Sequence, residues 1–218
     1  MKSLRSLLIK ICTNRFLHFN QSSAVRGFIA TFFKDELLAN RNNDKLRYQS
    51  SLVQYKIIQG KIFLTAMEQG IDLLREVNNL KFLRINGEKI YIEDISYLEG
   101  EQYIGEVESD INYKFLTPWI PLNQENYQRY ISANEEDQKL EILKKILVGN
   151  IISFCKSFDY HINNKICVHK LAVIPGISKV KNNKMTSFTG EFSINFLLPQ
   201  YWGIGRSSSK GYGTVIQL

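Results

Sequence analysis

The chain has 218 residues, 44% of them hydrophobic, which is enough for one sizeable core or two small ones. Its 28 Lys and Arg against 21 Asp and Glu leave a net charge of +7, which favours polyanionic partners. Three widely spaced cysteines and three histidines argue against a disulfide framework, a cysteine zinc site and a His-rich metal centre. No apolar run approaches the ~18 residues of a membrane span. We expect a cytoplasmic protein with no metal, cofactor or membrane partner.

The first half of the chain shows six elements in chain order. Leu7, Ile9 and Ile11 alternate with other positions and predict a strand. Apolar residues at helical spacing from residue 25 to 33, after a cap at Ser22 or Ser23, predict a helix that ends near Leu38. The remaining predicted elements are strands at 52–58 and 62–64, a short helix at 67–74, and a hairpin at 82–92 that turns at Asn86-Gly87. This β-α-β-β-α-β order is the ferredoxin-like arrangement.

The second half is predicted to be a modified copy of the first. An acidic stretch at 100–110 marks the boundary, giving domains 1–105 and 106–218. The expected elements are a strand at 113–120, a long helix at 135–158, a strand from 166 that Pro175-Gly176 ends, a basic loop, and strands at 188–198 and 213–218. The fold class is therefore α+β, with two tandem ferredoxin-like domains and antiparallel sheets.

Residues 203–213 form the most informative stretch, Gly-Ile-Gly-Arg-Ser-Ser-Ser-Lys-Gly-Tyr-Gly. Glycines let backbone N–H groups point into one concavity and let a phosphate chain approach, while serines and cations add donors and charge. The alternative is a flexible hairpin tip, which needs fewer glycines. The string is not a P-loop, because no G-x-x-x-x-G-K-[ST] pattern occurs. The residues predicted to contact RNA are Gly203, Gly205, Arg206, Ser207, Ser208, Ser209, Lys210, Gly211 and Tyr212, with Lys181 and Lys184 of the basic loop.

The string from Gly190-x-Phe192 through Pro199 and Trp202 to Gly213 resembles the C-terminal glycine-rich motif of the repeat-associated (RAMP) superfamily. Within it the chain is similar to the CRISPR-associated endoribonucleases that process precursor CRISPR RNA. Further matches run in family order: Val25-Arg-Gly-Phe-Ile29, Leu52-Val-Gln-Tyr-Lys-Ile-Ile58, Phe115-x-Thr-Pro-Trp-x-x-Leu-Asn123 and Gly149-Asn-Ile-Ile-Ser153. The resemblance therefore covers most of the chain.

The resemblance implies metal-independent cleavage by the 2′-hydroxyl next to the scissile phosphate, which leaves a 2′,3′-cyclic phosphate and a 5′-hydroxyl. Such chemistry needs a base, an acid and positive charge. The family typically carries one or two histidines in a His-Asn-His-like string after the first helix, and then a tyrosine. In this chain Ala39 and Arg41 occupy the histidine positions and Tyr48 follows.

Two explanations of Ala39 stay open. It is either a deliberate substitution that traps an uncleaved complex, or the mark of a lineage that lost or relocated its catalysis. Arg41 would stabilise phosphate charge or serve as a solvated cation, and Tyr48 would bond a reacting oxygen or pack beside the next strand. The default reading of His18, His161 and His169 is structural.

The partners that the resemblance implies are CRISPR repeat RNA or mature crRNA, and a second copy of the chain in a homodimer. A CRISPR effector complex, in which the chain is a non-catalytic RNA-binding subunit, is the rival to the enzyme. A general RNA-binding module is a third alternative.

Overall fold

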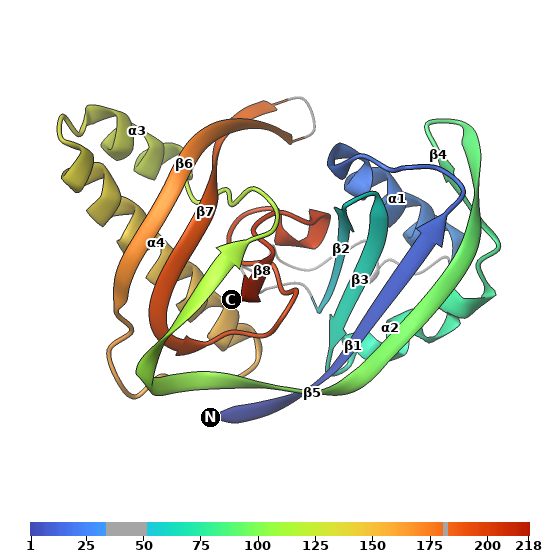
Figure 1. The fold of residues 1–218 in the computed structure, drawn as a ribbon, viewed down its shortest axis with the longest axis horizontal. Helices are drawn as coiled ribbons and strands as arrows, with labels where there is room; N and C mark the ends of the chain where they lie inside the picture. The colour runs from blue at the N-terminus through green and yellow to red at the C-terminus, as the bar shows by residue number, and fades with distance from the viewer. Residues whose placement is uncertain (34–51, 181–182) are drawn as a thin grey trace. The chain divides into compact units, whose positions relative to one another are not determined.

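A computed structural model describes residues 1–33, 52–180 and 183–218, which fall into two compact units. The N-terminal unit consists of Ser3–Gln102 and Ser209–Gly211. The C-terminal unit consists of Met1–Lys2, Tyr103–Ser208 and Tyr212–Leu218. Both units combine helices with antiparallel strands, so the predicted α+β class is confirmed (Figure 1). No helix in these ranges is long and apolar enough to cross a membrane.

The N-terminal unit follows the predicted β-α-β-β-α-β order. Its strands lie side by side in the order β2-β3-β1-β5, and β4 pairs with the start of β5. The elements are β1 (Lys2–Thr13), α1 (Ser22–Phe32), β2 (Val53–Ile58), β3 (Lys61–Met67), α2 (Gly70–Leu74), β4 (Phe82–Ile85) and β5 (Glu88–Phe115), with short 3-10 helices at Phe19–Gln21 and Arg75–Asn79. The prediction that the first helix reaches Leu38 concerns residues outside the described ranges.

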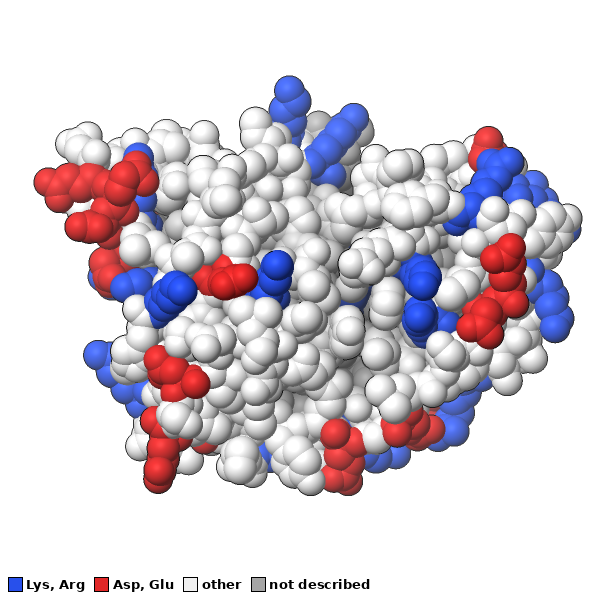
Figure 2. All heavy atoms as spheres, viewed as in Figure 1, with Lys and Arg blue, Asp and Glu red and all other residues white. Residues whose placement is uncertain are grey.

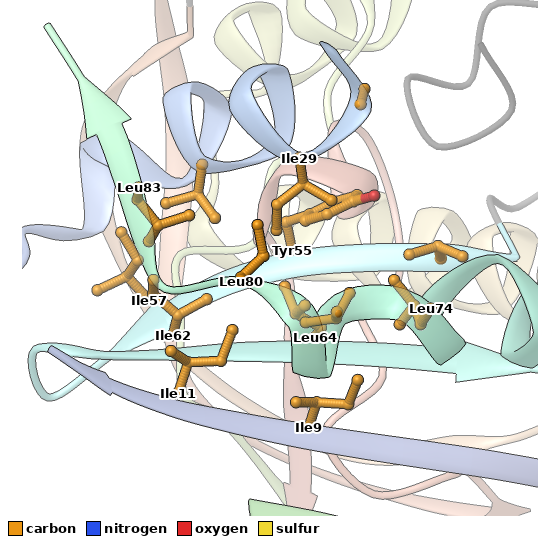
Figure 3. Packing of buried hydrophobic residues seen from close by; sticks show 14 of the residues in the cluster. Ile9, Ile11, Ile29, Tyr55, Ile57, Ile62, Leu64, Leu74, Leu80 and Leu83 are labelled. Carbon is orange, nitrogen blue, oxygen red and sulfur yellow. The ribbon is translucent and has the colours of Figure 1, made fainter. Parts of the chain in front are cut away.

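One face of these strands meets α1 and α2 in an aliphatic core (Figure 3). Alternate residues of each strand point into it, as the period of two requires. Ile9 and Ile11 of β1 lie near Ile62 and Leu64 of β3, and Ile29 of α1 is fully buried above them. Burial of this cluster therefore fixes the register of the N-terminal strands.

Two hairpins in this unit turn on two residues with positive φ. Gln59 and Gly60 have φ of 50° and 78°, and Asn86 and Gly87 have φ of 52° and 86°. Positive φ at both central residues is the type I′ geometry that suits the twist of a two-residue hairpin. The turn predicted at Asn86-Gly87 is confirmed.

The strand β5 runs for 28 residues through the acidic stretch in which the domain boundary was predicted. The separate strand predicted at 113–120 is wrong, because residues 113–115 are the end of β5. Most of residues 93–103 are exposed, so the hydrophobic alternation that identifies a strand is missing there. The proposed limits 1–105 and 106–218 stay a prediction about separate domains.

The C-terminal unit contains the strand order β5-β7-β6, with β8 paired to the end of β5. Its elements are α3 (Gln124–Ser132), α4 (Glu136–Ser157), β6 (Val168–Val180), β7 (Asn183–Leu197), a 3-10 helix at Ser208–Lys210, and β8 (Val215–Gln217). The helix α3 was not predicted, because it buries no residue. The Asn123 side chain caps it by accepting from the Asn126 N–H at 2.7 Å.

The strand β6 continues through Pro175-Gly176, although the predicted strand ended there. That prediction was wrong because β6 is the last strand in the order, and proline is tolerated on an edge strand that needs no further donor. Lys179 and Lys184, expected in a loop, are instead paired across the β6–β7 hairpin.

A half-buried carboxylate anchors the segment after α4 to β5. Glu106 Oε1 accepts from the backbone N–H of Asn163 at 2.6 Å and of Asn164 at 3.0 Å, and Oε2 accepts from the Tyr160 hydroxyl. Burial raises the pKa of Glu106, but these hydrogen bonds outweigh it and lower the pKa to about 2.

Glu106→Gln is expected to lower the free energy of unfolding at pH 7 by roughly 2 kcal/mol, because hydrogen bonds to a charged acceptor are lost. The folded pKa lies below the unfolded one, so this stabilisation is present above about pH 4.5 and is lost as the pH falls towards 2. Urea unfolding from pH 7 to pH 2 measures it. Glu108→Gln, on the exposed part of the same strand, is the matched control. Parallel pH curves for wild type and Glu106→Gln would contradict the assignment.

Candidate nucleic-acid interface

The glycine-rich loop, residues 203–213, is a folded segment between β7 and β8. Gly203 bridges Thr214, the Ile204 N–H donates to Gly213 O at 3.0 Å, and the Gly213 N–H donates to Pro118 O at 2.9 Å. Among its residues Arg206 is exposed, the serines and Lys210 are half-buried, and Gly211 to Gly213 are buried. The loop is therefore a folded segment and differs from the flexible hairpin tip that was the alternative.

Three glycines of the loop have positive φ and lie against other backbone or side chains. A Cβ on Gly213 (φ 64°) would lie 2.1 Å from Ile204 O. One on Gly205 (φ 85°) would lie 2.8 Å from Asn150 Oδ1, and one on Gly211 (φ 91°) would lie 2.8 Å from Tyr55 O. Close packing inside the protein therefore accounts for these glycines, and their contact with RNA stays a prediction.

The first half of the loop rests on two segments that are distant in sequence. Trp119 Nε1 donates to Asn150 Oδ1 of α4 at 3.0 Å, and Gly205 packs on this pair. The Arg206 N–H donates to Ile120 O at 3.2 Å, so the backbone that carries the exposed guanidinium is fixed. Three of the motifs that carried the family resemblance thus meet at Gly205.

The tip of the loop, Ser209–Gly211, belongs to the N-terminal unit. Arg26 Nη1 of α1 donates to Ser209 Oγ at 3.0 Å. Gly211 packs on the backbone of β2 at Tyr55 and Lys56. Arg26 is partly buried and is a further functional candidate, within the Val25–Ile29 motif.

Lys56 lies beneath this tip and was also missed. Its side chain is fully buried, and Nζ donates to Gln54 Oε1 at 3.1 Å and to Thr65 Oγ1. Burial lowers the pKa of Lys56 well below its ordinary value. A lysine on a strand is normally read as solvent-facing, so no sequence signal marked it.

The β6–β7 hairpin approaches the loop through Tyr212, whose hydroxyl donates to Lys179 O at 3.0 Å. Lys179 pairs with Lys184, so both cations lie on the strand ends nearest the loop. Lys181, the other predicted contact of this hairpin, is outside the described ranges.

The expected catalytic positions Ala39, Arg41 and Tyr48 also fall outside the described ranges, between α1 and β2. Of the three histidines, all described, His169 is the one paired with a carboxylate in these ranges: its Nδ1 lies 2.7 Å from Asp110 Oδ2. This pair lies where β5 and β6 both slip in register against β7, which gives His169 a structural role.

Two family models match the chain in sequence order. One, described as the Cas6b N-terminal domain, matches residues 2–102, and the other, described as the Cas6b C-terminal domain, matches residues 105–218. The chain belongs to the Cas6b family. The resemblance to precursor-crRNA-processing endoribonucleases is confirmed at this level.

Individual relatives agree with this assignment to the Cas6b family. An uncharacterized protein of Methanocaldococcus jannaschii is 42% identical over 142 residues, which are 64% of this chain and 95% of the relative. A crystal structure of Cas6b matches 100% of both chains with a TM-score of 0.92 at 32% identity. A crystal structure described as the CRISPR RNA processing endoribonuclease Cas6b matches 100% of both chains with a TM-score of 0.81 at 31% identity.

Charge is unevenly distributed over the surface of this Cas6b family member (Figure 2). Acidic side chains gather around α3 and the start of α4, where Glu125, Glu135, Glu136 and Asp137 are all exposed. Lys and Arg side chains protrude around the tip of the β6–β7 hairpin. The acidic end repels polyanions, so of these two regions of the C-terminal unit the basic hairpin is the one that attracts them.

Proposed function

We propose that this chain is an endoribonuclease that binds CRISPR repeat RNA and cuts precursor crRNA within its repeats, without a metal. The observation that carries the proposal is membership of the Cas6b family along almost the whole chain, from residue 2 to residue 218. The positive net charge and the lysines of the β6–β7 hairpin agree with a polyanionic substrate.

Cleavage would proceed by attack of a ribose 2′-oxygen on the adjacent phosphorus. A base takes the 2′-hydroxyl proton, the bond from phosphorus to the 5′-oxygen breaks, and an acid protonates that oxygen. The products are a 2′,3′-cyclic phosphate and a 5′-hydroxyl, so atoms and charge balance. Arg41 and Tyr48 are the proposed partners of the phosphate and of a reacting oxygen.

The glycine-rich loop is proposed to hold the ribose-phosphate chain. Gly205 packs on Asn150 of α4 and the Arg206 N–H donates to Ile120 O, so the exposed Arg206 side chain extends from a preorganised segment. A cation on a fixed backbone loses less conformational freedom when it binds a phosphate than one on a mobile tip.

Cleavage is tested by incubating the chain with a repeat transcript in excess EDTA and analysing the product ends. The proposal expects tight binding and cuts at one position that leave a cyclic phosphate. Binding that ignores the repeat sequence and shape would instead favour the general RNA-binding module. No binding at all would refute the proposal.

Arg206→Ala and Lys210→Ala are each expected to weaken binding of the repeat transcript and to reduce the slope of log affinity against log salt by about 0.7, the value for one phosphate of a single strand. Fluorescence anisotropy at salt concentrations from about 50 to 300 mM measures this slope. Lys145→Ala, on the exposed side of α4, is the matched control. An unchanged slope in both loop variants would remove the loop from the interface.

A second function is favoured by the residues at positions 39 and 41. Neither Ala nor Arg shuttles protons near neutral pH, so a chain that binds but does not cut would be a crRNA-binding subunit of a CRISPR effector complex. Dimerisation remains a prediction under both functions.

A further inference from the structure

A surface hollow of about 320 Å³ lies in the N-terminal unit, where β1 ends beside the β2–β3 turn. Its lining includes Thr13, Asn14, Arg15, Phe16, Lys61 and Glu93, and no Val, Leu or Ile side chain contributes to it. The hollow thus combines one aromatic ring with hydroxyl, amide and charged groups. Its volume is at the lower end of the range for small-ligand sites.

Phe16 is the aromatic wall of this hollow, and 68% of it is exposed. Its ring lies on the turn: a Cβ added to Gly60 would be 2.4 Å from Phe16 Cδ2. His18 contacts the ring edge-on, with centroids 5.5 Å apart, and the Leu17 N–H donates to Gly60 O at 3.4 Å. The ring is therefore held in place while most of its surface faces solvent.

Polar groups surround this ring in fixed positions. Thr13 Oγ1 donates to Arg15 O at 2.8 Å, and Arg15 Nη1 lies 2.6 Å from Glu88 Oε2. The Asn14 N–H donates to Tyr91 O at 3.1 Å, and Asn14 Oδ1 accepts from the Tyr91 N–H at 3.0 Å. These bonds place the strand that carries Tyr91 directly beside the hollow.

Tyr91 supplies a second exposed aromatic ring at this place, with 52% of the residue accessible. Lys89 Nζ lies 4.9 Å from the centre of the Tyr91 ring. Exposed aromatics interleaved with cations are the elements from which proteins build surfaces for single-stranded nucleic acid.

We infer that this hollow binds an unpaired nucleotide of the RNA, with its base stacked on Phe16 and its phosphate near Arg15 and Lys61. The carboxylate of Glu93 and the amide of Asn14 are placed to bond the polar edge of the base. The inference rests on the proposed function, because it assumes an RNA substrate. The centre of a protein-binding surface is depleted of charged residues, whereas Arg15, Lys61 and Glu93 line this hollow.

The test compares three substitutions of one residue. Phe16→Ala is expected to weaken binding of a labelled single-stranded repeat transcript about tenfold, because one stacked base is lost. Phe16→Trp keeps the stacking surface and should bind like wild type, whereas Phe16→Leu keeps the apolar volume and should behave like alanine. Tyr127→Ala, which removes an exposed aromatic from α3, is the control. Cross-linking of a 4-thiouridine transcript, read by peptide mass, should label residues 14–16.

Each other outcome has a defined meaning. If wild type binds the transcript while Phe16→Ala binds equally well and residues 14–16 stay unlabelled, the inference fails and the proposed function stands. If Phe16→Ala instead dissociates a dimer without changing RNA affinity per protomer, the hollow is a contact between copies and the inference fails. If wild type binds no RNA, both fail together.

Discussion

Ala39→His is expected to raise the rate of repeat-RNA cleavage in EDTA by two to four orders of magnitude, the usual contribution of a positioned acid or base (roughly 10²–10⁴-fold). The reason is that histidine exchanges a proton near neutral pH and alanine does not. Single-turnover rates at saturating protein measure this gain separately from binding. The result would identify Ala39 as the cause of any inactivity of the chain.

Ala39→Gln is the matched control, because glutamine forms hydrogen bonds but does not exchange protons at neutral pH. Adding Arg41→His to Ala39→His tests the second family position. Should wild type, Ala39→Gln and Ala39→His all bind the transcript tightly while none of them cuts it, the chain is a binding subunit and the enzyme proposal is wrong.

Gly213→Ala is expected to lower the free energy of unfolding by about 3 kcal/mol or more, and the melting temperature by roughly 6–12 °C. Gly213 has a φ of 64°, and a Cβ there would lie 2.1 Å from Ile204 O. That oxygen is backbone, so the clash is relieved only by moving the loop from its hydrogen bond to Pro118 O. Thermal unfolding by circular dichroism and calorimetry measures the loss.

Gly149→Ala serves as the control for Gly213→Ala. Gly149 lies within α4, and a Cβ there meets nothing within 4 Å, so alanine should stabilise the protein by about 0.5–1 kcal/mol. A Gly213→Ala variant as stable as wild type would show that the loop adapts, and the packing explanation of its glycines would then be wrong.

Local pattern was sufficient to predict most elements of the N-terminal unit. Alternation identified β1, and Asn86-Gly87 identified a hairpin whose two residues do have positive φ. The missed helix α3 and the strand wrongly started at residue 113 share one physical cause, which is that α3 and the middle of β5 bury little. An element without a buried face leaves no periodic signal, however regular its backbone is.

The contacts that shape the candidate site also could not be predicted from local sequence. Composition drew attention to residues 203–213, but the reasons for its glycines are contacts with Trp119, Asn150 and Tyr55, which only the tertiary fold supplies. The hydrogen bond from Arg26 to Ser209 joins residues 183 positions apart. A local stretch of sequence does not contain both residues, so Arg26 was not predicted to be a site residue.

The grouping of Ser209–Gly211 with the N-terminal unit constrains how the family can vary. A polypeptide that ended at residue 102 would keep both of its helices yet lack the three residues that cover the β2 backbone and bond Arg26. Chimeras that exchange halves between relatives would therefore need a loop tip matched to the recipient's α1 and β2. In such chimeras, residues 26, 55 and 209–211 would have to come from the same parent, because they contact one another.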